Sequence, residues 1–379
     1  MTPKSLSPIR ASALAFVALA TGACDGVPSL SSARGGGDTV FVGVAVGLRT
    51  PERYADVFPG VQMALDELNA SRPTGAPVLA LRRARSGARS AVEVAAGFRD
   101  APEVIGVVGH TESDATIDAS PIYEDRANGG ARALVAVSPV ANGTMVTRLG
   151  DWVFRACPKI ASTAQVLARF ALDSLRVRRV AVIYRNDPMG KDFRRAFSAE
   201  FTRGGGEIVE SDPFVEDIPE FSAYGARIVR RGVPAIAMAG NGPDLQRARL
   251  AARAGGGNPL MLSSNPPPAD LASADHAGWY YLSIFSADRP PTPEGERFVE
   301  AFEQAQGHKP DLWSALSYDA AMLIGRAVHD VGPDRRRVRD WIAAVGRSKP
   351  AYVGVTGRIA FDEHGDPIDK PVLVRTESR

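Results

Sequence analysis

Short apolar runs alternate along the chain with longer stretches in which apolar residues recur at helical spacing. Residues 40–46 are apolar and rich in β-branched side chains, which is typical of a strand buried on both faces. Residues 60–68 place four apolar side chains on one face of a helix. Residues 78–81, 91–98 and 133–137 continue the alternation as strand, helix and strand. This order predicts a parallel sheet that is covered by helices.

A second series of strands and helices begins after residue 154. A helical pattern at 161–175 precedes a buried-strand pattern at 180–184. Near the end of the chain, residues 359–361 and 372–374 could form a hairpin around a polar turn. The two series look alike in architecture, although no sequence repeat relates them.

One stretch joins a buried strand to a helix through a polar turn. Residues 104–108 predict the strand, Gly109 permits a sharp change of direction, and a helical pattern follows. Thr111, Ser113 and Asp114 lie at the junction. Ligands of open α/β sheets collect at the carboxyl ends of strands, so these side chains are candidates for ligand contact. The alternative is that Ser113 or Asp114 only caps the helix.

Size and composition fit a globular protein of two domains. The chain has 379 residues, of which 45% are hydrophobic and 23% are charged. Its net charge of +2 argues against a general nucleic-acid-binding protein. There are two cysteines, Cys24 and Cys157. No local motif activates Cys157, so we expect a small packed residue there and not a nucleophile.

The N-terminal segment has the pattern of an export signal. Lys4 and Arg10 precede the apolar residues 11–20, and small residues then lead to Cys24. The apolar run is too short to span a membrane.

The Gly-Ala-Cys sequence that ends at Cys24 resembles the lipobox of bacterial lipoproteins. In that family the cysteine is acylated and becomes the first residue of the mature chain. Thr21 departs from the aliphatic residue that is usual at its position. We expect a lipoprotein signal peptide at 1–23 and a flexible tether at 24–37. The alternative is ordinary cleavage beside an incidental cysteine.

The chain lacks the local motifs that commonly mark nucleotide, metal or catalytic sites. No Gly-x-Gly-x-x-Gly follows the first strand pattern, and Gly190-Lys191 lacks the earlier glycine of a P-loop. The five histidines lack zinc-site spacing, and residues 362–366 lack calcium-loop spacing. No Gly-x-Ser-x-Gly occurs. The sequence therefore predicts no enzyme, no cofactor and no metal.

Several motifs, in order along nearly the whole mature chain, resemble those of one family. They include Gly60-Val-Gln-Met-Ala-Leu-Asp-Glu-Leu-Asn69, Ile105-Gly-Val-Val-Gly-His-Thr-Glu-Ser113, Trp152-Val-Phe-Arg155, Val182-Ile-Tyr-Arg-Asn-Asp-Pro-Met-Gly190 and Gly354-Val-Thr-Gly-Arg-Ile-Ala-Phe-Asp-Glu-His-Gly-Asp366. With them, the chain resembles the type I periplasmic solute-binding proteins of the leucine/isoleucine/valine-binding kind, which serve ABC transporters. Each motif is weak alone, and their joint order carries the resemblance.

The resemblance implies two α/β lobes, each a doubly wound parallel sheet, joined by three crossovers with the ligand held between them. We place the crossovers near Phe154, Phe285 and Tyr352. The expected limits are 38–155 with 286–350 for lobe 1, and 156–285 with 351–379 for lobe 2. Such lobes close on their ligand by a hinge motion.

The resemblance also implies ligand-binding residues in lobe 1. The family's carboxylate site matches the Ser113 hydroxyl, the backbone N–H of Val140 and the side chain of Asn142. Asn142 is a partial match, because the family has Thr or Ser there. Tyr54 resembles the tyrosine that lines lobe 1, with a one-residue shift in spacing.

Lobe 2 departs further from the family pattern. Met189 and Asn241 stand where the family has aromatic residues, and Asn265 stands near its acidic ligand for an ammonium group. An Asn carbonyl accepts a hydrogen bond but carries no opposing charge. We therefore expect a neutral or anionic polar ligand and not a branched-chain amino acid held in the usual way. Glu112, Asp114 or Asp187 could still supply the charge from another direction.

The favoured function is an extracytoplasmic, lipid-anchored binding protein in the periplasm or cell envelope. It would pass a small polar solute, of the amino-acid, amide or carboxylate type, to an ABC transporter permease. The alternative is a ligand sensor on the same fold that signals to a partner protein. An enzyme ranks last, because the sequence offers no catalytic motif.

Overall fold

The computed structural model describes residues 39–48, 54–215, 218–267 and 277–376. The predicted signal peptide, the tether and the lipidation site Cys24 lie outside these ranges. Among the described residues, no helix is both long enough and apolar enough to cross a membrane.

The first sheet has five strands, and every neighbouring pair is parallel. In spatial order they are β2 (Val78–Arg83), β1 (Thr39–Ala45), β3 (Val104–Gly109), β4 (Ala136–Ser138) and β5 (Val153–Arg155). All six residues of β3 are buried, as its unbroken apolar pattern predicts.

Helices cover both faces of this sheet. Val42 and Val44 of β1 pack into the apolar cluster that contains α1, α8, α9 and α10, whereas Ala45 packs with α2 and α3. Successive strand residues thus bury opposite faces under different helices. The bounds are α1 (Val57–Ala70), α2 (Ala91–Arg99), α3 (Ser113–Tyr123), α8 (Pro293–Gln306), α9 (Leu312–Val331) and α10 (Arg335–Ala344).

The second sheet has six strands and is parallel except at one edge. In spatial order they are β13 (Leu373–Thr376), β10 (Trp279–Ser283), β9 (Leu260–Ser263), β8 (Ala235–Ala239), β6 (Arg179–Arg185) and β7 (Glu207–Phe214). The exception is β13, which pairs with β10 in the antiparallel sense.

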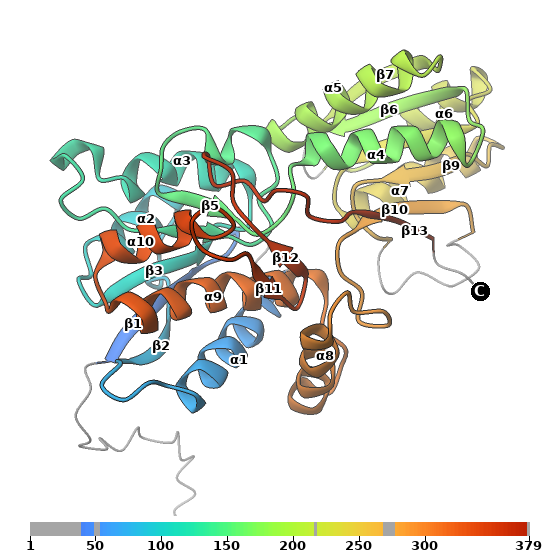
Figure 1. Ribbon diagram of the computed structural model, residues 1–379. Coiled ribbons are helices and arrows are strands. Elements are labelled where there is room, and N and C mark those ends of the chain that lie inside the picture. Colours follow the sequence, from blue (N-terminus) through green and yellow to red (C-terminus); the bar gives the residue numbers. More distant parts are fainter. Residues whose placement is uncertain (1–38, 49–53, 216–217, 268–276, 377–379) are drawn as a thin grey trace, which may run out of the picture. The chain divides into compact units, whose positions relative to one another are not determined.

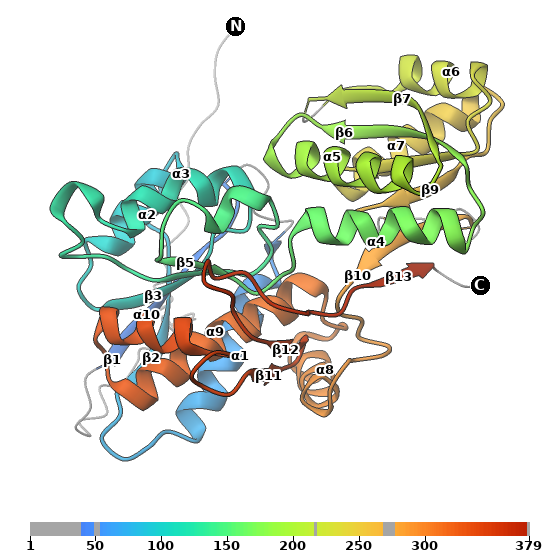
Figure 2. The same ribbon diagram turned by 45° about the horizontal axis from the view of Figure 1, so that its top comes forward.

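The second sheet is covered in the same way. Val180 and Val182 of β6 pack with α4 (Ile160–Asp173) and α5 (Pro188–Arg203). Ala181 and Ile183 face α6 (Ser222–Arg230) and α7 (Gly242–Ala254). Figures 1 and 2 show these helix pairs on opposite faces of the sheet. The predicted architecture of two helix-covered parallel sheets is confirmed.

The C-terminal segment follows a different path from the predicted one. The prediction of a hairpin between residues 359–361 and 372–374 is wrong. Instead β12 (Gly357–Ile359) pairs with β11 (Tyr352–Gly354), and residues 373–376 form the edge strand β13.

This path also bears on the predicted lobe limits. Tyr352, Ile359 and Phe361, which the predicted limits of 351–379 place in lobe 2, belong to the apolar cluster of the first sheet. Only the last described strand, β13, joins the second sheet.

A buried carboxylate explains the unexpected hairpin. Asp319 of α9 is fully buried, and its two oxygens accept hydrogen bonds from the N–H groups of Val355 (2.8 Å) and Thr356 (2.9 Å). These residues form the turn between β11 and β12. The turn is therefore fixed by a side chain from a distant helix, and its two central residues, Val355 and Thr356, are not typical turn residues.

Candidate functional site

A cavity of about 110 Å³ lies at the carboxyl ends of strands of both sheets. All seven residues predicted to bind the ligand line this cavity: Tyr54, Ser113, Val140, Asn142, Met189, Asn241 and Asn265. The structure thus brings these seven residues, which lie far apart in the chain, together at one place. Polar and apolar surfaces line it together, as is usual for small-molecule sites.

Ser113 does not cap its helix. It is the first residue of α3, and the capping position belongs to Glu112, whose side chain makes no capping hydrogen bond. The Ser113 hydroxyl oxygen accepts the N–H of Gly143 at 3.0 Å. A hydroxyl also carries one proton to donate, so Ser113 can still give a hydrogen bond to an acceptor in the cavity.

The turn before Ser113 depends on a glycine. Gly109 has φ +138°, and a Cβ there would lie 2.4 Å from the carbonyl oxygen of Ala45. The chain then reaches Thr111, whose hydroxyl accepts the N–H of Gly47 at 2.9 Å. Thr111 therefore ties the ends of β1 and β3 together beside the cavity.

Residues 140–143 form a second wall, which we call the ligand loop. The N–H of Ala141 donates to the Ser138 hydroxyl (3.1 Å), and the carbonyl of Asn142 accepts the N–H of Ile160 (2.8 Å). Across the part of the chain that the structure describes, the N–H of Val140 donates to no protein acceptor. It is thus a donor that a ligand oxygen in the cavity could use.

The two asparagines of the second sheet present opposite ends of their amides. The Asn241 side-chain oxygen caps α7 by accepting the N–H of Asp244 at 2.8 Å. The Asn265 side-chain nitrogen donates to the carbonyl of Gly240 at 2.7 Å. Because the protein uses one end of each amide, Asn241 keeps donors for a ligand and Asn265 keeps an acceptor.

Charged and aromatic side chains that were not predicted to bind the ligand also line the cavity. Arg185 forms an ion pair with Asp187, which caps α5. Trp313 meets Tyr54 edge-to-face, with ring centroids 6.3 Å apart. The position of Arg185 at the carboxyl end of β6 could have indicated a place in the ligand site. Trp313, near the start of α9, stands in no local pattern that indicates such a place.

Of the three acidic residues named as alternative charges, the structure places Glu112 in the cavity wall. Asp114 and Asp187 do not line the cavity. Among the residues that the structure describes, the cavity wall contains the carboxylate of Glu112 and the guanidinium of Arg185. Together these could accommodate a ligand that carries both charges.

A buried histidine lies in the chain directly before Thr111, which lines the cavity. His110 follows β3 directly, and its ring lies with Nε2 2.9 Å from the hydroxyl of Tyr123. Burial lowers the pKa of His110 to about 4, so the ring is neutral near pH 7. Its carbonyl accepts the Ser138 hydroxyl at 2.6 Å, which links β3 to the start of the ligand loop.

No group of three or more potential metal-ligating side chains occurs within the described ranges. Cys157 is a free, buried cysteine at the cavity wall, and burial raises the pKa of its thiol to about 11. A thiol in this state is unreactive at neutral pH. The arrangement is suited to holding a small molecule by hydrogen bonds and shape.

Known proteins that resemble this chain belong to one family of binding proteins. A family model described as periplasmic binding protein matches residues 39–377. An "Amino acid binding protein" of Pseudomonas aeruginosa is 24% identical, and the match covers 89% of this chain and 91% of that protein. The Leu/Ile/Val-binding protein homolog 1 of Brucella suis is 25% identical, with 86% of this chain and 87% of that protein covered.

Solved structures share the fold. The branched-chain amino acid binding protein LivJ from Streptococcus pneumoniae, in complex with isoleucine, has a TM-score of 0.77 at 19% identity, covering 90% of this chain and 98% of that chain. A solute-binding protein from R. palustris, in complex with 4-hydroxybenzoate, has a TM-score of 0.76 at 19% identity, covering 89% and 93%. The chain therefore has the type I fold and belongs to the periplasmic binding protein family.

Proposed function

We propose that this chain is an extracytoplasmic solute-binding lipoprotein that captures a small polar ligand and delivers it to an ABC transporter permease. The observation that carries the proposal is the cavity at the strand ends of both sheets, whose wall offers a ligand the Val140 N–H and one end of each of the Asn241 and Asn265 amides. Family membership supports the role, because relatives are named as amino-acid-binding proteins.

The proposal includes a division into two lobes, each built on one sheet, which close on the solute. Strand and helix order supports this division, and the cavity draws its lining from both sheets. Binding would favour the closed arrangement because only there do both sets of residues meet the ligand.

We further propose that the ligand carries a carboxylate. The Ser113 hydroxyl and the Val140 N–H are donors in the cavity wall, and both suit a carboxylate oxygen. Isoleucine and 4-hydroxybenzoate, named with two structures of this fold, each carry that group. Glu112 could then meet an ammonium group if the solute is an amino acid, whereas Arg185 and Asn241 suit a second polar end.

A thermal-shift panel tests the function. Amino acids, aromatic carboxylates, amides and polyols should be compared, since a ligand at a hundred times its dissociation constant stabilises the fold by about 2.7 kcal/mol. We expect stabilisation by at least one carboxylate. Stabilisation by polyols or amides alone would contradict the carboxylate assignment, and no response to any class would count against the binding function.

Ser113→Ala should weaken binding of the solute found in that panel by about ten- to a hundredfold. The expected loss is about 1.5–3 kcal/mol, the usual contribution of a hydrogen bond to a charged oxygen. Isothermal titration calorimetry measures the affinity. Ser162→Ala, at an exposed position of α4, is the matched control and should bind like the wild type. Unchanged affinity in a folded Ser113→Ala protein would remove Ser113 from the site.

Cys24→Ser should move the protein from the membrane fraction to the soluble fraction. The motive is the basic start, the apolar run and the Gly-Ala-Cys sequence. Several acyl chains on one residue hold a protein firmly to a membrane, and a chain without them has no such attachment. Cell fractionation and mass spectrometry of the mature N-terminus provide the measurement. A mature N-terminus upstream of residue 24 would show that the lipoprotein assignment is wrong.

A further inference from the structure

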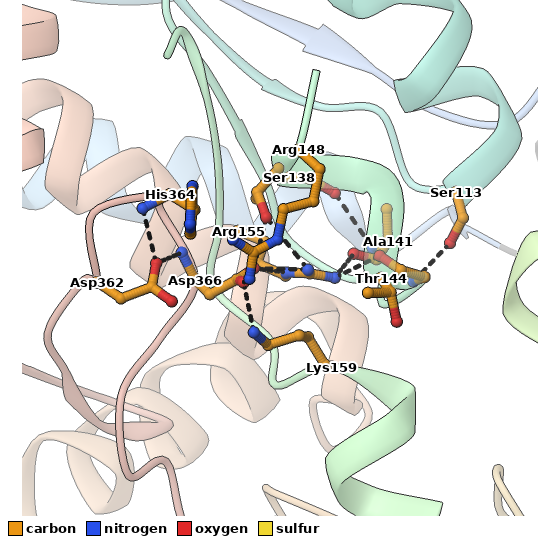
Figure 3. Close-up of polar contacts among 12 residues, drawn as sticks. Ser113, Ser138, Ala141, Thr144, Arg148, Arg155, Lys159, Asp362, His364 and Asp366 are labelled. Atoms are coloured by element: carbon orange, nitrogen blue, oxygen red, sulfur yellow. Dashed lines mark hydrogen bonds and ion pairs between the residues drawn. The ribbon is translucent and has the colours of Figure 1, made fainter. Parts of the chain in front are cut away.

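An ionic cluster centred on the buried side chains of Asp366 and Arg155 lies next to the ligand loop. It consists of Thr147, Arg148, Arg155, Lys159 and Asp366. Figure 3 shows how Arg148, Arg155 and Lys159 converge on Asp366. The Asp366 carboxylate is 1% exposed. It accepts the Thr147 hydroxyl (2.6 Å) and Nε of Arg155 (2.6 Å), and it lies 2.7 Å from Nζ of Lys159.

The protonation state of Asp366 follows from its burial and its neighbours. Burial alone would raise the pKa of the Asp366 carboxyl, but Arg155 and Lys159 together hold it below its usual range. Asp366 is therefore ionised near pH 7. A buried guanidinium needs such a partner, because an uncompensated charge in the interior is strongly unfavourable.

Arg155 connects this carboxylate to the ligand loop. Its side chain is completely buried. While Nε and Nη2 face Asp366, Nη1 donates to the carbonyls of Gly143 (2.7 Å) and Ala141 (3.4 Å). A guanidinium is planar, so fixing one edge on the carboxylate fixes the direction of the other. Arg155 thus holds two carbonyls of the loop. The Gly143 N–H of the same loop donates to the Ser113 hydroxyl.

The turn that carries Asp366 is itself well defined. The Asp362 carboxylate accepts the N–H groups of His364 and Asp366, each at 2.9 Å. In addition, the N–H of Arg155 donates to the carbonyl of Gly365 at 3.1 Å. Residues 362–366 are therefore fastened to the end of β5, and they present Asp366 to an arginine 211 positions earlier in the chain.

We propose that Asp366 is a positioning residue for the solute site: through Arg155 it holds the ligand loop in the shape that presents the Val140 N–H and the Ser113 hydroxyl to the ligand. This role rests on the proposed function of the cavity. Its physical effect is to reduce the ordering that the loop must undergo when the solute binds.

Hydrogen exchange measured by mass spectrometry, on the protein without added solute, tests the positioning role. Asp366→Asn keeps the side-chain shape and removes the negative charge. Arg155→Lys keeps the positive charge but removes the planar guanidinium that contacts Asp366 and the loop carbonyls together. Loss of one charge-assisted hydrogen bond should speed exchange in peptides covering 138–147 by about tenfold. Peptides covering 179–185 should change much less. Asp118→Asn and Arg169→Lys, at exposed positions, are the matched controls and should resemble the wild type.

The outcomes are distinct. Faster exchange confined to the loop supports the proposal. Equal acceleration in all peptides, or wild-type exchange in the loop of a folded Arg155→Lys protein, overturns it. If Asp366→Asn does not fold, Arg155→Lys decides.

A binding measurement with isoleucine and with 4-hydroxybenzoate separates this proposal from the proposed function. For any probe that the wild type binds, Arg155→Lys should weaken the affinity by about tenfold. Wild-type affinity in a folded Arg155→Lys protein would contradict the positioning role. Failure of the wild type to bind any solute would count against the function, and the exchange comparison would still decide whether Asp366 orders the loop.

Discussion

Asp319→Ala should lower the free energy of unfolding by about 3–5 kcal/mol. The carboxylate is fully buried and accepts the N–H groups of Val355 and Thr356, together with the hydroxyls of Thr356 and Tyr352. Alanine would leave two buried N–H groups without acceptors in a turn that is 1–2% exposed. It would also remove a negative charge that opposes the effect of burial, which lowers the pKa of Lys370.

Urea denaturation monitored by circular dichroism measures this loss. Glu300→Ala, at an exposed position of α8, is the control and should stay within about 0.5 kcal/mol of the wild type. A loss below about 1 kcal/mol for Asp319→Ala would mean that the hairpin does not depend on this carboxylate.

Acid should destabilise the protein through His110 before most carboxylates titrate. Burial lowers the pKa of His110 to about 4 from the ordinary value of 6.5. Between these values the unfolded chain binds a proton that the folded protein does not, so stability falls as the pH falls. The expected contribution is about 3 kcal/mol, fully present above pH 6.5 and lost on the way to pH 4.

The variant His110→Gln isolates this contribution. Its side chain can still meet the Tyr123 hydroxyl, but it does not titrate. Asp125 and Asp366, whose pKa values lie below the ordinary range, lose their contributions only at more acidic pH, and they do so in both proteins. Denaturation at several pH values should therefore give a flatter curve for His110→Gln. Parallel curves for the two proteins would show that His110 is not responsible.

The sequence predicted best where local pattern and topology coincide. The unbroken apolar run of β3 marked a strand buried on both faces, and Gly109 marked its end. Because ligands gather at such ends, the residue order made Ser113 a candidate for ligand contact, with helix capping as the alternative. The family resemblance added Val140, Asn241 and Asn265, which also line the cavity.

What the sequence did not reveal depends on contacts between distant residues. Arg155 and Asp366 are 211 positions apart, and neither stands in a local pattern that indicates burial. Asp319 occurs in an apolar helix, where it fixes a turn more than thirty residues later, as its bond to Val355 at a separation of 36 shows. Single-sequence patterns report on neighbours along the chain, so such pairs become visible only in three dimensions.

The order in which the strands and helices of the first sheet occur has a consequence for biosynthesis. Val42, Val44 and Val108 share an apolar cluster with Leu323 and Ile324 of α9, which is made only after the entire second sheet except β13. A nascent chain that holds β1 to β5 thus has one sheet face that its own sequence cannot yet fully cover. Long-range pairing of this kind slows folding and exposes apolar surface in the meantime. In this protein, the first half of the chain must stay soluble without its final partner until α9 has been synthesised.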